Sequence, residues 1–254
     1  MESFREIVRS GVPLAFAHRG HNVALPENTM AAFQAAYDMG IRFLETDIRS
    51  SRDGVSFVFH DADLIRLNGD PRKIGDMSAA EIEAVRLDGS HPIPRLDDLL
   101  EAFPDAYFNL DAKSEDGPEA MAQVLLAHGA AARICIGSFS DKRIRRTLKA
   151  MGQDVCHSLG TGSAVRFYLG ARVGLRQNFG ADCVQFPMRH KGVRTTDRQI
   201  VNFARKVGLS FHVWTVNSPD VMRYLMDLEV QGIMSDDTAL LKSELLARNR
   251  WTAF

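Results

Sequence analysis

Short apolar runs alternating with amphipathic helical stretches are the feature of this sequence that most restricts its fold. Helical patterns separate most of these runs, each of which has the length and composition of a strand. Repeated β/α units favour a parallel sheet, because each helix returns the chain to the start of the next strand. The predicted strands are residues 14–18, 42–48, 55–60, 106–112, 133–138, 154–159, 182–186, 209–216 and 230–235.

The length of 254 residues suits a closed barrel of eight strands, which leaves one strand candidate peripheral. We predict a single α/β domain over residues 1–254, a TIM-type (β/α)8 barrel. Residues 49–54 are too few for a helical crossover, but they could return to the bottom of the barrel in extended form. Residues 61–105 are too many for one helix and rich in turns, so we predict a small insertion over the carboxyl-terminal rim.

Composition excludes several classes of protein. The net charge of -1 offers no basic excess for nucleic acid, and no apolar run approaches the roughly 20 residues of a membrane span. The first residues lack the features of a secretory signal. Cys135, Cys156 and Cys183 are odd in number and widely spaced, which predicts buried free thiols in a reducing, cytoplasmic compartment. The sequence does not determine the oligomeric state, and a homo-oligomer is possible.

Local signals predict where several helices begin and end. Asn28 is the predicted N-cap of the first long helix, and Gly40 its C-terminal stop. A capping box predicts a helix over residues 78–87. The basic residues of a helix near 141–151, Arg143 among them, are predicted to form a solvated outer face.

Glu45 and Asp47 lie two positions apart near the end of a buried apolar run, so both side chains point to one face of the predicted strand. Adjacent buried carboxylates repel each other unless a cation lies between them. The pair therefore suggests a metal site, although Glu-x-Asp alone is more often a solvated strand edge.

Three further strand ends carry polar residues, which parallel neighbouring strands would gather at one rim. Each has a simpler alternative, since a histidine at a strand end often caps a carbonyl and the Asp111–Lys113 pair could be a surface ion pair. The residues are His18 and Arg19, His60 and Asp61, and Asn109, Asp111 and Lys113.

Together these groups suit phosphodiester chemistry. The three carboxylates of Glu45, Asp47 and Asp111 match a hard divalent cation. The cationic side chains among the set would neutralise phosphate oxygens. The two imidazoles have ordinary pKa values near 6.5, which suits proton transfer near neutral pH.

Several short segments form an ordered series along the chain, although none is specific alone. They are Ala-His-Arg-Gly at 17–20, Pro-Glu-Asn-Thr at 26–29, Leu-Glu-Thr-Asp at 44–47, Asp-Gly at 53–54, Phe-His-Asp at 59–61, Ile-Pro at 93–94, Asn-Leu-Asp-Ala-Lys at 109–113, Gly-Ser-Phe at 137–139, Phe-His-Val-Trp-Thr-Val-Asn at 211–217 and Gly-Ile-Met-Ser-Asp at 232–236. The series, spanning 14–241, resembles the glycerophosphodiester phosphodiesterase family of phospholipase-C-like barrel phosphodiesterases.

The resemblance implies hydrolysis of glycerophosphodiesters to glycerol 3-phosphate and an alcohol. It further implies that the glycerol 2-hydroxyl attacks phosphorus and that water opens the resulting cyclic phosphate. The implied residues are Glu45, Asp47 and Asp111 for a divalent ion, Ca²⁺ or Mg²⁺, His18 and His60 for acid–base catalysis, and Arg19 and Lys113 for the phosphate.

Further expectations concern Trp214, Glu27, Asp111, Gln185 and the remaining histidines. Trp214 resembles an aromatic residue near the glycerol pocket, although barrel packing would explain it equally well. Glu27 resembles a residue of the family that orients the site residues. An acidic residue in the first turn of a helix, where it interacts favourably with the helix dipole, would explain Glu27 equally well. Asp111 stands where the family usually has glutamate, which leaves the choice of metal open. Gln185 could reach the cleft. The histidines at 21, 91, 128, 157, 190 and 212 are predicted to be structural.

Two alternative functions stay open at this point. A related phosphodiesterase acting on lysophospholipids would need a long apolar groove at the rim, and residues 61–105 offer only scattered apolar side chains. A non-catalytic barrel that binds phosphodiesters is the other alternative, against which the presence of both His18 and His60 argues.

Overall fold

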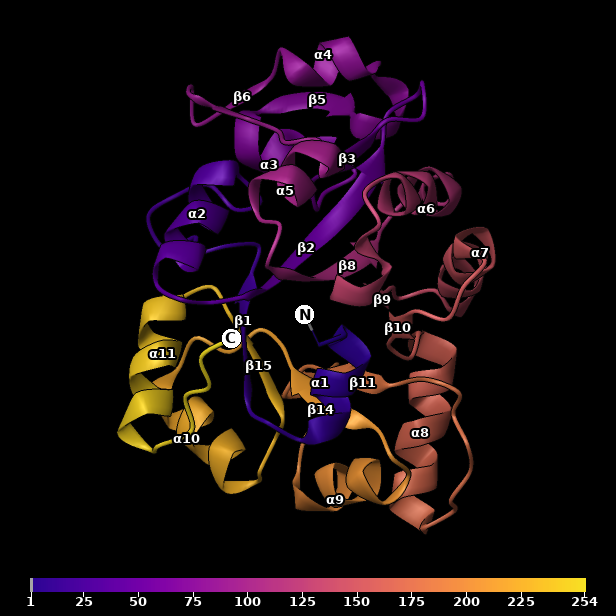
Figure 1. Cartoon of the computed structure of the whole chain (residues 1–254), viewed down its shortest axis with the longest axis vertical. Helices are drawn as coiled ribbons and strands as arrows, with labels where there is room; N and C mark the ends of the chain where they lie inside the picture. Colours follow the sequence, from indigo (N-terminus) through magenta and orange to yellow (C-terminus); the bar gives the residue numbers. More distant parts are fainter. Residues whose placement is uncertain (1) are drawn as a thin grey trace.

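Eight parallel strands form a nearly closed barrel in the computed structural model, which describes residues 2–254 (Figure 1). They pair in the order β10-β9-β8-β2-β1-β15-β14-β11, and a bridge from Ser158 to Cys183 joins the two ends of this series. The predicted TIM-type fold is confirmed. The strands are β1 (Leu14–His18), β2 (Phe43–Ser50), β8 (Tyr107–Ala112), β9 (Ile134–Gly137), β10 (Cys156–His157), β11 (Cys183–Phe186), β14 (Ser210–Val213) and β15 (Gly232–Ser235).

Helices surround the barrel (Figure 1). Their apolar faces pack on the outer side of the strands and form the larger hydrophobic core. None of the helices within residues 2–254 is long and apolar enough to span a bilayer. The surrounding helices are α2 (Met30–Asp38), α5 (Leu96–Ala102), α6 (Gly117–Ala127), α7 (Asp141–Met151), α8 (Thr161–Val173), α9 (Arg198–Lys206), α10 (Pro219–Asp227) and α11 (Thr238–Ala247), with a short helix η2 (Ala130–Arg133) before β9.

Helix α1 (Phe4–Ser10) closes the amino-terminal end of the barrel, and Figure 1 places it across the barrel centre. The fully buried Phe4 ring packs edge-on against Phe43 at 5.4 Å between centroids. Arg5 anchors the helix by donating from Nε to Asp182 at 2.9 Å. The three cysteines lie in this inner core, buried and without disulfides, as predicted.

The chain after β2 takes a different path from the extended return predicted for residues 49–54. Strand β2 continues to Ser50, and a turn leads into β3 (Ser56–Val58), which pairs antiparallel with β2 so that Val58 lies opposite Ile48. The turn is possible because Gly54 adopts a left-handed φ of 83°. His60 therefore reaches the rim from above, as the last part of a hairpin.

Residues 61–105 begin with a small lobe that has its own core. Figure 1 shows it beyond the end of β2, to one side of the barrel. Ile74, Ile82 and Leu87 are buried together, so apolar residues that look scattered in sequence share one cluster. The predicted capping box begins helix α4, which ends earlier than predicted because the next residues form a strand. The elements are β4 (Asp63–Leu64), α3 (Ile65–Asn68), β5 (Asp70–Lys73), η1 (Ile74–Asp76), α4 (Ala79–Glu83), β6 (Arg86–Leu87) and β7 (His91–Pro92).

Two glycines with nearly the same left-handed φ provide a matched test of packing at the site. Gly20 follows β1 with a φ of 86°, and a Cβ there would lie 2.6 Å from the backbone carbon of Ala32. Gly54 has a φ of 83° but open space around it. We expect Gly20→Ala to lower the free energy of unfolding by about 3 kcal/mol or more, and Gly54→Ala by about 1 kcal/mol. Urea denaturation measures both, and equal losses would mean that the close approach of Ala32 does not restrict position 20.

Candidate active site

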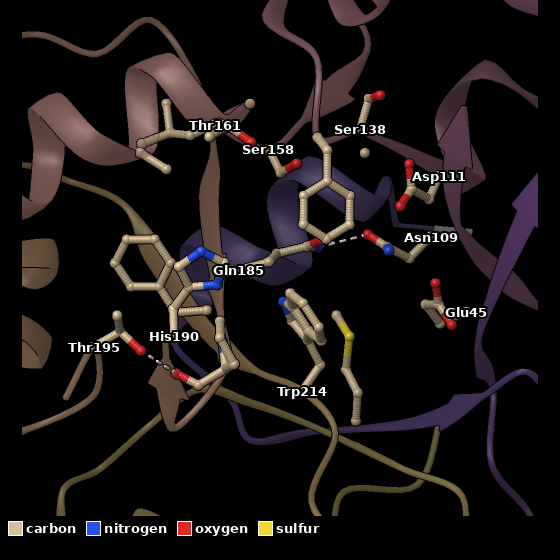
Figure 2. A pocket seen from close by; sticks show the side chains of 18 of the residues that line it. Glu45, Asn109, Asp111, Ser138, Ser158, Thr161, Gln185, His190, Thr195 and Trp214 are labelled. Atoms are coloured by element: carbon tan, nitrogen blue, oxygen red, sulfur yellow. Dashed lines mark hydrogen bonds between the residues drawn. The ribbon is translucent and has the colours of Figure 1, made fainter. Parts of the chain in front are cut away.

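The pairing of β2 with β8 brings the predicted carboxylates side by side. In the parallel register Glu45 lies opposite Asn109, and Asp47 lies opposite Asp111. All four side chains line a cavity of about 450 Å³ at the carboxyl-terminal ends of the strands, together with His18, Arg19, His60, Lys113, Gln185 and Trp214. Figure 2 shows Glu45, Asn109 and Asp111 grouped at one end of this pocket.

Two cations neutralise the buried Asp47. Lys113 places Nζ 3.0 Å from Asp47 and 2.6 Å from Asp111, and Arg19 places Nε 3.1 Å from Asp47. Burial disfavours the charged form of Asp47, yet the Lys113 and Arg19 charges outweigh it and hold the pKa below its ordinary value. The site therefore contains an ionised carboxylate held between two fixed cations.

Glu45 and Asp111 are in a different electrostatic state. Burial is the main cause that raises the pKa of Glu45 to about 7, and the negative charge of Asp47 is the second. Burial also raises the pKa of Asp111. Glu45 Oε2 and Asp111 Oδ1 have no hydrogen-bond partner within residues 2–254. Across the same residues no three acidic, histidine or cysteine side chains converge closely enough to hold an ion as they stand. The oxygen donors themselves are of the type that Ca²⁺ and Mg²⁺ prefer.

His18 is oriented by Asp236, the last residue of the motif at 232–236. The two residues approach to 2.7 Å between Nδ1 and Oδ1, and Asn217 donates to the other carboxylate oxygen at 2.6 Å. These bonds outweigh burial and lower the pKa of Asp236 to about 2. Burial opposes the protonation of His18, but the Glu45 charge and the Asp236 bond raise its pKa. Nε2 of His18 lies 3.8 Å from Glu45.

His60 is held in a similar way, by a chain of charged groups. Its Nδ1 lies 2.6 Å from Asp61, which accepts a 2.6 Å hydrogen bond from Arg66. Arg66 also donates to Glu27, and Glu27 accepts from Arg19 at 2.8 Å. Glu27 precedes helix α2 and does not belong to its first turn, so its contacts with the two arginines explain its position better than a helix dipole.

Asn28 has a role that sequence reasoning missed. The predicted N-cap of α2 is wrong, because Thr29 caps the helix by accepting from Ala32 N. Asn28 instead adopts a φ of 59°, which asparagine tolerates better than most residues. Its side chain donates to Asp47 at 3.2 Å and accepts from Thr46 at 2.8 Å. Two adjacent cap-forming residues in the sequence gave no means of choosing between them.

Three other residues lie in the pocket or next to a residue that lines it. Gln185 reaches the pocket and donates to Asn109 at 2.7 Å. His190, predicted to be structural, lines the pocket. Arg143, predicted to be solvated, is largely buried and donates to the backbone oxygen of Lys113 at 2.9 Å, which fixes the segment that carries this cation.

The side of the pocket opposite the carboxylates combines a group of apolar residues with several polar ones. Figure 2 shows Thr161, His190 and Thr195 across the cavity from Glu45 and Asp111. Trp214 lies between these ends, with its ring edge-on to Phe139 at 5.7 Å. Residues 61–105, all within the described chain, contribute nothing to the lining. The apolar lining residues of this part are Phe139, Leu159, Ala164, Val165, Tyr168, Phe186, Pro187 and Val193.

The raised pKa of Glu45 predicts a pH-dependent stability. Ionised Glu45 is disfavoured in the folded state but not in the unfolded chain, so its cost is absent below pH 4.5 and complete above about pH 7. In EDTA-treated protein above that pH, we expect Glu45→Gln to raise the free energy of unfolding by up to about 3 kcal/mol. Below pH 4.5 the two proteins should be nearly equal.

Urea denaturation at several pH values measures this difference, and Glu101→Gln on the exposed side of α5 is the control substitution of the same type. A Glu45→Gln variant that is less stable than the wild type above pH 7 would contradict the raised pKa of Glu45.

Comparisons with known proteins identify relatives of this chain. A sequence model of the Glycerophosphoryl diester phosphodiesterase family matches residues 18–240. The Mycobacterium tuberculosis protein named "Probable glycerophosphodiester phosphodiesterase 2" is 38% identical over 252 residues, which cover 97% of this chain and 96% of that protein.

Solved structures agree with this assignment. A glycerophosphodiester phosphodiesterase from Agrobacterium tumefaciens has a TM-score of 0.74 and 26% identity, over 92% of this chain and 99% of that chain. An Oleispira antarctica phosphodiesterase has been solved in complex with the product sn-glycerol-3-phosphate. Its TM-score is 0.77, and the match covers 94% of this chain and 98% of that chain. Because the two sequences are 21% identical, this match shows that the folds are alike. The chain therefore belongs to the glycerophosphoryl diester phosphodiesterase family of enzymes.

Proposed function

We propose that the protein hydrolyses glycerophosphodiesters to glycerol 3-phosphate and an alcohol, using a divalent cation and two histidines. The observation that carries this proposal is the meeting of carboxylates, cations and carboxylate-bound imidazoles in one pocket. Family membership supports the reaction class, and the related M. tuberculosis protein is named for the same substrate.

Arg19 and Lys113 are the proposed contacts for the phosphoryl oxygens. Both side chains are mostly buried and already held by carboxylates, so they need little reorganisation when charge develops on phosphate. Trp214 is proposed to line the glycerol part of the substrate, because its ring offers an apolar surface to the glycerol carbons.

His18 and His60 are the proposed proton-transfer pair. Each has its Nδ1 bound to a carboxylate, which keeps the proton there and leaves Nε2 for the reaction. One histidine takes the proton of the glycerol 2-hydroxyl as this oxygen attacks phosphorus, and the other protonates the departing alcohol. The roles reverse when water opens the cyclic phosphate to glycerol 3-phosphate.

Glu45, Asp47 and Asp111 would hold the cation. Ionised Asp47 and the unpartnered oxygens of Glu45 and Asp111 support this assignment. When bound, the ion supplies positive charge that stabilises the phosphoryl oxygens. The all-oxygen donor set is compatible with Ca²⁺ and with Mg²⁺.

The reaction is tested by measuring the release of glycerol 3-phosphate from glycerophosphocholine by EDTA-treated protein, before and after Ca²⁺ or Mg²⁺ is restored. We expect release with the ion and little without it. His18→Ala and His60→Ala should each lower turnover by roughly 10²–10⁴-fold, as expected for a general acid or base. Their melting temperatures should stay close to that of the wild type.

His128→Ala is the matched control, because His128 pairs with Asp97 outside the pocket. This variant should keep its turnover. Loss of activity and thermal stability together in the His18 or His60 variant would favour a structural role. No release with either ion from the choline, ethanolamine or glycerol diesters would contradict the reaction class.

Hydrolysis of lysophospholipids is a second candidate function, favoured by the apolar part of the pocket. This function needs an apolar groove, which the pocket provides with residues that include Leu159, Ala164, Tyr168, Phe186 and Val193. Residues 61–105, where the sequence analysis looked for such a groove, do not line the pocket. An apolar surface next to a phosphate site would bury an acyl chain. Both candidate reactions use the same polar residues.

Filling the apolar part of the pocket separates the two candidates. Ala164 lines the pocket and is partly buried, so Ala164→Phe would occupy space otherwise open to an acyl chain. If lysophospholipids are substrates, turnover of lysophosphatidylcholine should fall roughly tenfold or more relative to glycerophosphocholine. Ala80→Phe, on the exposed side of α4, is the control. An unchanged ratio of the two turnover rates would count against acyl-chain binding here.

A further inference from the structure

Helix α8 carries a row of apolar side chains on its exposed side. Val165, Leu169 and Val173 follow one another at four-residue intervals, so they lie along one side of the helix, and they are 52%, 58% and 76% exposed. Figure 1 shows α8 at the outer edge of the barrel. Single exposed apolar residues are common, but an aligned row on the outer side of a surface helix is not. We call these three residues the α8 ridge.

The α8 ridge is continuous with the pocket. Its first residue, Val165, lines the pocket, as do Phe139 and Val193, which are 51% and 50% exposed. Val165 therefore belongs both to the apolar lining of the pocket and to the exposed row on α8. An exposed apolar patch of this kind is typical of a surface that binds another protein or a membrane.

The segment of chain that contains the α8 ridge is basic, and Asp141, from α7, accepts from the backbone N–H groups at the start of α8. Residues 161–198 contain seven lysines and arginines and two aspartates, although the whole chain has a net charge of -1. Both aspartates are already paired, Asp182 with Arg5 and Asp197 with Arg172. The exposed cations of this stretch that form no ion pair with any carboxylate of residues 2–254 include Arg166, Arg176, Arg189, Lys191 and Arg194.

We propose that the α8 ridge and its surrounding cations dock the protein on an anionic lipid bilayer, with the mouth of the pocket opening next to the membrane. Exposed aliphatic side chains enter the interface between headgroups and acyl chains, while arginine and lysine are attracted to anionic headgroups. A second copy of the chain is a poorer partner, since a symmetric dimer would bring like charges together. Docking does not depend on which phosphodiester the enzyme cleaves.

Co-sedimentation with vesicles tests this proposal without any substrate. We expect the full chain to bind vesicles of phosphatidylcholine mixed with phosphatidylglycerol, to bind phosphatidylcholine alone much less, and to lose binding as salt is raised. The double variants Leu169→Ser/Val173→Ser and Arg166→Gln/Arg189→Gln should each weaken binding by roughly tenfold or more. None of these four residues lines the pocket, so turnover of soluble glycerophosphocholine should stay unchanged.

Two control variants carry the same kinds of change elsewhere. Leu246→Ser removes an aliphatic side chain that is 51% exposed on α11, and Lys73→Gln/Lys206→Gln removes two exposed cations outside residues 161–198. Both controls should bind vesicles like the wild type. No binding by the wild type, equal binding to neutral vesicles, equal loss in the controls, or a dimer that Leu169→Ser/Val173→Ser dissociates in light scattering would overturn the proposal.

Discussion

Burial of three carboxylates on one pair of neighbouring strands is the constraint around which the rest of the site is arranged. The register of β2 on β8 sets Asp47 directly opposite Asp111, with Glu45 on the same face. Such a cluster destabilises the fold unless cations or protons neutralise it. Lys113 and Arg19 neutralise Asp47, and the raised pKa of Glu45 shows that this carboxylate is not fully compensated. A bound cation would favour the ionised form of Glu45, which is the physical basis of the proposed metal site.

Ion pairs also link the insertion to the polar end of the pocket. Arg66, from the lobe beyond β2, binds Asp61 and Glu27, and these two carboxylates hold His60 and Arg19. The lobe contributes nothing to the pocket lining among the described residues, so its effect on the site passes through this chain of ion pairs. A long insertion can therefore serve the active site by orienting it and not by covering it.

The pocket combines two environments that suit different parts of one ligand. Its polar end, with the cationic side chains of Arg19 and Lys113, suits a phosphate, whereas its other side, around Tyr168 and Phe186, suits an apolar group. Val165 of this side also begins the exposed apolar row on α8, in a segment whose exposed cations include several without an ion pair to any carboxylate of residues 2–254. A substrate that belongs to a membrane, or a membrane itself, accounts for both features with one physical explanation, the removal of apolar surface from water beside anionic headgroups.

The sequence by itself determined the barrel and most of its polar residues, because both depend on local patterns. Alternation along a strand puts Glu45 beside Asp47 and Asp111 beside Lys113, whatever the remainder of the chain does. Only the tertiary structure decided the antiparallel path of residues 49–54, the choice of Thr29 over Asn28 as helix cap, and the link from Arg66 to Glu27. It also decided that His190 shares one pocket with Ala164, Val165 and Tyr168 of α8. Each of these depends on a contact between segments distant in sequence, or on a choice between two locally equivalent conformations, and local patterns contain no information about either.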